Sequence, residues 1–535
     1  MASPSAVSAA ARPAVHPVVG PTARLLSRLD AAANRLFESR YNPLYRSGAV
    51  TVALLAVLLA TGLYLLLFYR VGTPYESVAR ITDQVWTGRW IRGVHRFAAD
   101  AAVATALVHA VRMFAQRRSW GRRAMPWVTG VGLVALVLVC GWTGYVMVWD
   151  VFGQLLAVEG ARILDLLPLF SEPLGRAFVG EQPIPGAFFF LNLFLHIALP
   201  IGMGVVLMVH VSRVARPVLF PARRLVWFGV ALLVIVSVAL PVDMASRADP
   251  FRLPTFVPVD AFYAFWLPVA RTLPPAGTAA IGAALLLALL LVPRLTGPAP
   301  ALLRPPSRVD HRLCTGCEQC ALDCPYEAIT MVERTDGRPT MLARVDPARC
   351  VSCGICVGSC APMGVGPAER TGRDQLAAAR AFARRHAPGA SDVVVIACTR
   401  GSGGAARDER FDGAPVFAID CAGSLHTSVI EMFVRDGAGG VLVFACPVED
   451  CWNREGAIWL EQRLFHDREA ELQERVDRRR VMLAHASFAE SGRARAMLAR
   501  FRASIASLEH ARGEGDVDLL RLCDEAPRRE EEDVA

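Results

Sequence analysis

The sequence predicts a multidomain protein: an α-helical membrane bundle of about six spans, then a small α+β domain, then a small α/β domain with a parallel sheet. Nearly all the long apolar runs lie before residue 297, whereas every cysteine except Cys140 follows it. A chain of 535 residues with so sharp a change in composition is too uneven for one domain. We expect a disordered N-terminus at 1–22, the membrane domain at 23–296, a Pro-rich linker at 297–310, the α+β domain at 311–365, a helical linker at 366–390, the α/β domain at 391–503 and a charged tail at 504–535.

Six apolar segments are long enough, or nearly so, to cross a bilayer. They are residues 48–69, 94–114, 127–148, 189–211, 225–241 and 277–293, of which the last two are short. The segments after the second, fourth and sixth carry arginines and no acid, whereas the opposite loops mix both signs. The positive-inside rule therefore predicts a multi-pass protein of the cell inner membrane with both termini and the cysteine-rich domains in the cytoplasm. Residues 23–40 are expected to form an amphipathic helix on the membrane surface.

Two apolar segments each carry a pair of histidines at a spacing of fourteen, His95 with His109 and His196 with His210. At 100° per residue this spacing leaves only ~40° of angular error, so each pair lies on one helix face, about 21 Å apart along the axis. Two such helices side by side would form two bis-histidine sites near opposite surfaces of a ~30 Å apolar core. This geometry suits two b-type haems, and the alternative is four core histidines bonded to backbone carbonyls.

Glycines repeat the same spacing in two other spans, Gly48 with Gly62 and Gly130 with Gly144. A haem ring needs close backbone approach, which a residue without Cβ allows, although small residues also serve plain helix packing. Three arginines near the histidine levels are candidates for neutralising haem propionates, or for anchoring the spans at the interface: Arg92, Arg96 and Arg112.

The segments "WIRGVHRFAAD", "GWTGYVMVWD" and "LFLHIALP" resemble cytochrome b of the quinol:cytochrome c and plastoquinol reductases, over about residues 25–290. The resemblance implies two haem b groups and a quinone substrate. It also implies that His95 and His196 bind the haem nearer the outside, and that His109 and His210 bind the haem nearer the cytoplasm.

That family has a Pro-Glu-Trp-Tyr motif in the outside loop between its fifth and sixth spans. Aligned on "ARTLP", this chain has Val259, Asp260, Ala261 and Phe262 there, so only a carboxylate is kept. Asp260 is therefore a candidate quinol proton acceptor, acting as a general base. The alternative is a solvated loop acid, which would leave quinol oxidation on the outside in doubt.

The α+β domain contains two runs of cysteines with the bacterial ferredoxin spacing, each ending in Cys-Pro or Cys-Ala-Pro. In this pattern the fourth cysteine of each run binds the cluster of the other run. The expected ligand sets are Cys314, Cys317, Cys320 and Cys360 for one [4Fe-4S] cluster, and Cys350, Cys353, Cys356 and Cys324 for the second. Zinc sites or disulfides are the alternatives, and the stretch 309–365 resembles two-cluster ferredoxins.

In the last domain a cysteine ends or follows each of three apolar strands, "DVVVIACT", "APVFAID" and "GVLVFAC". The carboxyl ends of parallel strands meet at one sheet edge, where four thiolates suit a [2Fe-2S] cluster. The expected ligands are Cys398, Cys421, Cys446 and Cys451, with zinc as the alternative. "DCAGSL" and "GGVLVFACPVEDCWNREG" resemble the delta subunit of methyl-viologen-reducing hydrogenase, over about residues 391–500.

Together these patterns predict a membrane electron-transfer oxidoreductase subunit that links the quinone pool, through two haems, to cytoplasmic iron–sulfur clusters. Expected partners are membrane lipid, quinone and a cytoplasmic redox protein with flavin or iron–sulfur centres, and no nucleic acid; a homodimer is left open. The alternative is a non-turnover anchor or redox sensor for a cytoplasmic hydrogenase- or heterodisulfide-reductase-like complex. A third interpretation confines the quinone to the cytoplasmic side and leaves Asp260 idle.

Overall fold

The computed structural model describes residues 19–116, 118–120, 123–167, 174–178, 184, 186–249, 251, 260–297, 304–399, 411–466, 468–487 and 490–511. The chain forms two compact units. One is Arg46–Gly297, and the other combines helix α1 (Val19–Phe37) with the elements from strand β1 to helix α16. The expected N-terminal disorder, most of the tail and Val259 lie outside the described residues.

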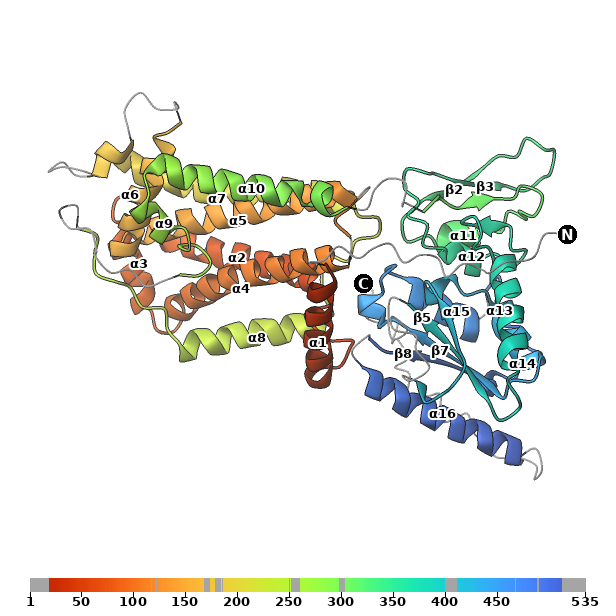
Figure 1. The fold of residues 1–535 in the computed structure, drawn as a ribbon. Coiled ribbons are helices and arrows are strands. Elements are labelled where there is room, and N and C mark those ends of the chain that lie inside the picture. Colours follow the sequence, from red (N-terminus) through yellow and green to blue (C-terminus); the bar gives the residue numbers. More distant parts are fainter. Residues whose placement is uncertain are drawn as a thin grey trace. The chain divides into compact units, whose positions relative to one another are not determined.

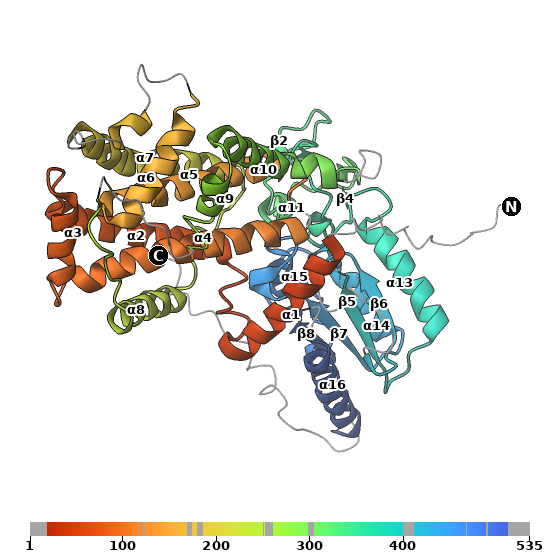
Figure 2. The same ribbon diagram turned by 60° about the vertical axis from the view of Figure 1, so that its left-hand side comes forward.

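The unit Arg46–Gly297 is a bundle of helices, and five of those in the described residues are long and apolar enough to span a membrane. They are α2 (Ser47–Phe68), α4 (Gly88–Ala115), α5 (Ala124–Val148), α7 (Gly186–Ser212) and α10 (Pro275–Thr296). Figures 1 and 2 show these helices running side by side, and α2 packs along α4 while α5 packs along α7. Large apolar side chains such as Leu67 and Ile201 point outward and are exposed, as expected for a surface that faces lipid.

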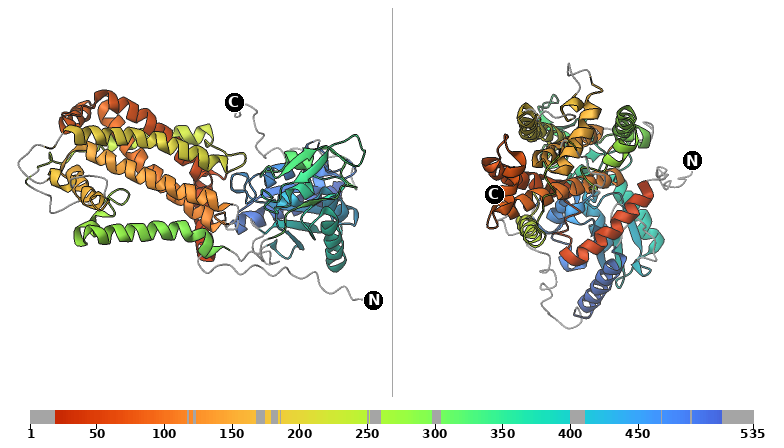
Figure 3. Two further views of the ribbon diagram at one scale, coloured as in Figure 1. Left: turned by 90° about the horizontal axis from the view of Figure 1, so that it is seen from above. Right: turned by 90° about the vertical axis from the view of Figure 1, so that its left-hand side faces the viewer.

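The segment predicted as the fifth span forms helix α8 (Arg223–Ala239), which lies along α4 and at 17 residues is shorter than the other spans. Three short helices cap one end of the bundle, α3 (Pro74–Asp83), α6 (Val151–Leu164) and α9 (Leu267–Thr272), as labelled in Figure 1; Figure 3 shows the same bundle from two further sides. Asp150 begins α6 because its side chain accepts hydrogen bonds from the backbone N–H groups of Phe152 and Gly153. This end of the bundle carries the loop with Asp260.

The ferredoxin-like part is built from two antiparallel strand pairs and two short helices. β1 (Arg308–Val309) pairs with β4 (Val365–Gly366), and β2 (Ile329–Val332) pairs with β3 (Leu342–Val345), while α11 (Gln319–Leu322) and α12 (Ile355–Gly358) each carry one cysteine. Its two halves repeat each other at an offset of thirty-six residues. Backbone positions with positive φ occur in matching pairs: Gly316 with Ser352, Glu318 with Gly354, and Glu327 with Met363.

The last part is a four-stranded, all-parallel sheet in the order β6 (Val416–Ile419), β5 (Val393–Cys398), β7 (Gly440–Ala445), β8 (Val481–His485). Helices α13 (Gly372–His386), α14 (Thr427–Arg435) and α15 (Gly456–Phe465) cover one face, and α16 (Ser491–Ala511) covers the other. Val394 and Ile396 point to the first face, whereas Val393 and Val395 point to the second. The predicted order of a helical region, a small domain with sheets and a parallel α/β domain is confirmed.

Helix α15 ends at Phe465, and the chain then continues irregularly and places Leu472 and Val476 in the core. Strand β8 and helix α16 were not predicted as elements of the sheet domain. The expected linker helix is α13, which begins at a capping box formed by Thr371 and Asp374 and contributes Ala379 to the same core.

Candidate functional site

The four span histidines lie on helices α4 and α7, two on each helix. His95 lies within electrostatic range of His196, and His109 lies within electrostatic range of His210. The spacing of fourteen therefore brings the rings together in the pairs expected from the sequence. Whether each pair binds a haem stays a prediction.

Each of the four span glycines lies against one of these imidazole rings. A Cβ added to Gly48 would lie 2.9 Å from Cε1 of His109. The corresponding distances from an added Cβ to Cε1 in the three other pairs are 3.3 Å for Gly62 and His95, 3.1 Å for Gly144 and His196, and 3.4 Å for Gly130 and His210. The absence of a side chain on α2 and α5 thus leaves space for the rings. Contact between these glycines and a haem face stays a prediction.

A threonine fixes the orientation of three of the imidazoles. Nδ1 of His196 lies 2.9 Å from Oγ1 of Thr143 and 3.0 Å from the carbonyl oxygen of Cys140, and the Thr143 hydroxyl donates its own proton to that carbonyl at 2.7 Å. The ring must therefore donate from Nδ1, which leaves the lone pair on Nε2 free to bind iron. The same arrangement, with a 2.9 Å contact to Nδ1 and the hydroxyl donating to its own helix, holds for Thr61 with His95 and for Thr129 with His210.

The sequence carries a signal for these hydroxyls that its interpretation missed. A serine or threonine directly precedes every one of the four glycines, as Ser47-Gly48, Thr61-Gly62, Thr129-Gly130 and Thr143-Gly144. The fourth member differs in structure: Ser47 is buried and its hydroxyl has no hydrogen-bond partner among the residues described. His109 is therefore the one ring of the four for which the hydroxyl contact is not formed in the described structure.

The three candidate propionate arginines have different surroundings. Arg92 donates from Nη1 to the carbonyl of Val242 and to Oγ1 of Thr82. Arg96 forms ion pairs with Asp100 and Asp260. Arg112 is almost fully buried near the end of α4.

Asp260 is the centre of a hydrogen-bonded network that joins the outside loop to the spans. Its Oδ1 accepts from the backbone N–H groups of Phe262 and Tyr263 at 2.8 and 2.7 Å. Its Oδ2 accepts from Arg96 at 2.6 Å and from the hydroxyl of Tyr145. Burial alone would raise the pKa of Asp260, but the hydrogen bonds from Tyr145, Tyr263 and Phe262 and the charge of Arg96 outweigh it and lower the pKa. The side chain is thus held as an ionised carboxylate with four donors.

In the ferredoxin-like part, four cysteines line one hollow. They are Cys314, Cys317, Cys320 and Cys360, the set expected for the first cluster. The N–H of Gly364 donates to Sγ of Cys360 at 3.2 Å, an interaction that stabilises a thiolate ligand. Cys317 is exposed, whereas Cys320 and Cys360 are buried. This donor set fits an iron–sulfur cluster.

The second expected set has equivalent backbone donors. The N–H of Ala328 donates to Sγ of Cys324, and the N–H of Ser307 donates to Sγ of Cys350, both at 3.3 Å. The thiol of Cys356 lies within electrostatic range of Cys353 and Cys324. Burial is the main cause that raises the pKa of the Cys356 thiol well above its ordinary value, so a bound cation would be needed to hold it as a thiolate.

Four buried cysteines line a second hollow at the carboxyl end of the parallel sheet, Cys398, Cys421, Cys446 and Cys451. Cys398 ends β5, Cys421 follows β6 and Cys446 follows β7, so strand order brings the three together. Sγ of Cys398 lies 3.7 Å from Sγ of Cys446. Within the described ranges, no three His, Cys, Asp or Glu side chains form a site for a single metal ion.

These folds and sites define a class: a membrane electron-transfer protein with redox domains appended to its spans. The comparisons with known proteins specify it further. Residues 33–240 match the family cytochrome b/b6/petB, residues 313–364 match the 4Fe-4S dicluster domain, and residues 393–509 match the delta subunit of methyl-viologen-reducing hydrogenase. The chain therefore carries a cytochrome b/b6 domain, a 4Fe-4S dicluster domain and a hydrogenase delta-subunit-like domain, in that order.

One relative is the menaquinol:cytochrome c reductase cytochrome b subunit of Geobacillus thermodenitrificans, 26% identical over 166 residues, which are 30% of this chain and 74% of the relative. Among solved structures, a chain of a hyperthermophilic respiratory Complex III matches with a TM-score of 0.38 and 17% identity, over 47% of this chain and 75% of that one. The family matches and the five apolar helices indicate a multi-pass membrane protein, with haem b in the first domain and 4Fe-4S clusters in the second.

Proposed function

We propose that this protein is the electron-transfer subunit of a quinone-linked oxidoreductase. It links the quinone pool, through two haem b groups, to two [4Fe-4S] clusters and one [2Fe-2S] cluster in the cytoplasm, where a flavin- or iron–sulfur-containing protein is the soluble partner. When bound, these groups supply one-electron chemistry. The observation that carries the proposal is that one chain combines two pairs of span imidazoles, each pair within electrostatic range and each ring packed on a glycine, with cysteine-lined hollows.

The residues of the chain have distinct parts in this proposal. Thr61, Thr129 and Thr143 hold three imidazoles with Nε2 available as a ligand. The four glycines leave room for the rings, and backbone N–H groups next to Cys324, Cys350 and Cys360 favour the thiolate form. The arginine-rich segments predict that the iron–sulfur domains and both termini lie in the cytoplasm.

A second candidate function confines quinone chemistry to the level of His109 and His210. The observation that favours it is the full set of hydrogen bonds to Asp260: a carboxylate that already accepts from four donors must lose one of them before it can take a proton. An Asp260→Asn variant separates the two candidates. Unchanged quinol oxidation would favour the inner site, and loss of quinol oxidation with intact haem spectra would favour Asp260 as the proton acceptor.

The test of the proposed function is anaerobic mixing of the purified full-length protein with a menaquinol analogue. Visible spectra follow haem reduction, and electron paramagnetic resonance follows the clusters. Quinol-dependent reduction of haem, or haem oxidation by the quinone when the clusters are reduced first, is the expected result. Haems that are present but exchange no electrons with the quinone would instead support the anchor or sensor alternative.

A further inference from the structure

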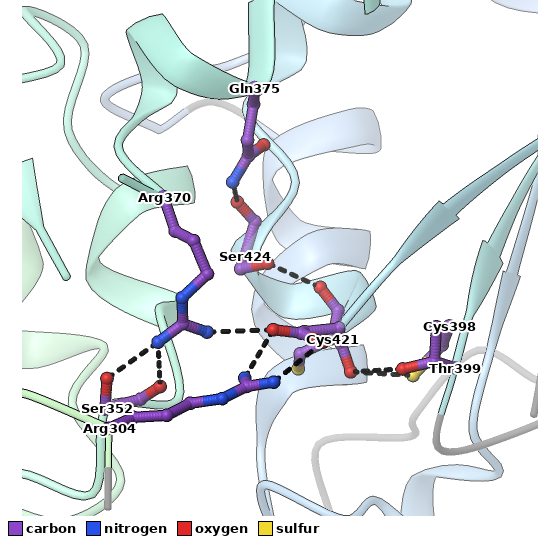
Figure 4. A network of polar contacts seen from close by, with 9 residues as sticks. Arg304, Ser352, Arg370, Gln375, Cys398, Thr399, Cys421 and Ser424 are labelled. Atoms are coloured by element: carbon purple, nitrogen blue, oxygen red, sulfur yellow. Dashed lines mark hydrogen bonds and ion pairs between the residues drawn. The ribbon is translucent and has the colours of Figure 1, made fainter. Parts of the chain in front are cut away.

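The ferredoxin-like part and the α/β part belong to one compact unit, and a single guanidinium joins two of their loops. Arg370 donates to the carbonyl of Ser352 at 3.1 Å and to its hydroxyl at 2.7 Å, and it forms an ion pair with Asp420 at 2.9 Å. Ser352 directly precedes Cys353, and Asp420 directly precedes Cys421. Figure 4 shows Arg370 between Ser352 and the loop that carries Cys421. Arg370 therefore connects one predicted ligand loop from each part.

A second pair of loops is joined nearby. The hydroxyl of Tyr326 donates to Oδ1 of Asn453 at 3.4 Å, and Arg454 donates to the carbonyl of Pro325 at 3.0 Å. Pro325 directly follows Cys324, while Asn453 and Arg454 follow Cys451 within three residues. This junction too links a cysteine of the set Cys324, Cys350, Cys353 and Cys356 to a cysteine of the sheet-edge set.

Close packing supports both junctions. Arg304 forms a further ion pair with Asp420, so two cations hold the carboxylate next to Cys421 (Figure 4). Gly354, which follows Cys353, has a φ of +83°, and a Cβ there would lie 3.2 Å from Cβ of Ser424. The thiols of Cys353 and Cys421 are near enough to interact electrostatically.

The other predicted 4Fe-4S set lies differently. The loop with Cys314 and Cys317 is held within its own part, because Arg334 donates to the carbonyl of Cys314 and Gly316 packs against the backbone of Met341. The fourth cysteine of this set, Cys360, contacts the α/β part through a 3.1 Å hydrogen bond between its carbonyl and Nε2 of His426. Arg463 contacts Ser359, which precedes Cys360 of this set, and also Asp323, which precedes Cys324 of the other set. Its contacts therefore do not favour either set as the neighbour of the α/β part.

We propose that Arg370 and Asp420 are positioning residues that hold the loop of Cys353 against the loop of Cys421. They make the set Cys324, Cys350, Cys353 and Cys356 the immediate redox neighbour of the sheet-edge set Cys398, Cys421, Cys446 and Cys451. The set with the exposed Cys317 is then the outer end of the chain of centres within this unit. This inference rests on the proposed function only in assuming that both cysteine sets bind their clusters; it does not depend on quinone.

The test uses the dithionite-reduced full-length protein and measures how a neighbouring paramagnet broadens, or relaxes, the electron paramagnetic resonance signal of the sheet-edge centre. Cys350→Ala removes a ligand of one 4Fe-4S set, and Cys314→Ala removes a ligand of the other. We expect the coupling to be lost in Cys350→Ala and kept in Cys314→Ala. The reverse pattern, or equal coupling in both, would overturn the assignment of neighbours. Absence of every cluster signal from the wild type would instead contradict the proposed function.

A second pair of variants keeps all ligand cysteines, so that misfolding after loss of a cluster cannot decide the result. Arg370→Gln removes the bridge, and Arg373→Gln makes the same change of charge at an exposed position of the same segment. When the iron content equals that of wild type, we expect the magnetic coupling of the sheet-edge centre in Arg370→Gln to be weaker and to cover a wider range of strengths. The Arg373→Gln signal should match wild type. Wild-type coupling in Arg370→Gln would rule out the positioning role.

Discussion

Nδ1 of His95 lies 2.9 Å from Oγ1 of Thr61, and Thr61 in turn donates to the carbonyl of Val57. The hydroxyl proton is thus engaged within helix α2, so the imidazole on α4 is the donor of the contact that joins the helices. The relationship recurs at His196 and His210, which indicates that the hydroxyls are part of the site rather than of helix packing alone.

The first prediction is that Thr143→Val weakens haem binding at the level of His196. Outer hydrogen bonds of metal-binding histidines typically contribute about 10–100-fold in affinity, and we expect a loss in that range. Titration of the apoprotein with haem, followed by visible absorbance, measures it. Thr105→Val is the matched control, because the Thr105 hydroxyl contacts Thr51 and its own helix backbone and no histidine. Equal affinity of the Thr143 variant and wild type would contradict the role.

The second prediction concerns the space opposite the rings. In Gly48→Ala, the new Cβ would lie 2.9 Å from the ring of His109, so the ring must shift away from its present position. We expect altered absorbance of the haem at that level. Gly132→Ala on α5 is the control, since a Cβ there meets nothing within 4 Å. If both variants had wild-type spectra, the close approach of Gly48 would not matter to the site.

The third prediction is a pH dependence. Asp260→Asn removes an ionised acceptor from Arg96 and should lower thermal stability by about 1–3 kcal/mol. The folded-state pKa of Asp260 is lowered below its ordinary 3.8, so its contribution is full above that value and is lost as pH falls through the lower folded pKa.

The difference in melting temperature between wild type and Asp260→Asn should therefore stay constant between about pH 5 and 8 and narrow below about pH 4. Asp83→Asn, at an exposed acid in the same cap region, is the control. A difference that narrows as pH rises through neutrality would show that Asp260 is protonated in the folded protein, and that the ion pair with Arg96 is not the stabilising interaction.

The fourth prediction tests the buried ion pair between the two parts of the iron–sulfur unit. Asp323 and Arg463 have fully buried side chains, and burial lowers the pKa of Arg463 to about 10 although the charge of Asp323 opposes this. In Arg463→Met, Asp323 loses this ion pair but keeps its second ion pair, with Arg468. Breaking a buried pair costs about 3–5 kcal/mol, and Arg468 should reduce that cost.

Denaturation of the full-length protein, followed by loss of iron–sulfur absorbance, measures this effect. The exposed pair Arg349 and Asp346 provides the control variant Arg349→Met, which should cost less than about 1 kcal/mol. Equal stability of the two variants would mean that the Asp323 pair does not hold the parts together.

The features that a sequence alone can predict are periodic or local. The spacing of fourteen places His95 and His109 on one face without knowledge of any partner, and the cysteine spacing of a ferredoxin acts over a few residues. The hydroxyls of Thr61 and Thr143 were missed because their role depends on a ring from another helix. The two side-chain donors to Asp260, Arg96 and Tyr145, come from residues more than a hundred positions away, which no local pattern reveals.

The most direct test of the central claim is a haem count on the purified full-length protein and on four variants, His95→Ala, His109→Ala, His196→Ala and His210→Ala. The account predicts two b-type haems per wild-type chain and, in each variant, loss of the low-spin absorbance of one haem, with His95 and His196 affecting one centre and His109 and His210 the other. Full wild-type absorbance in any one of the four variants would contradict it.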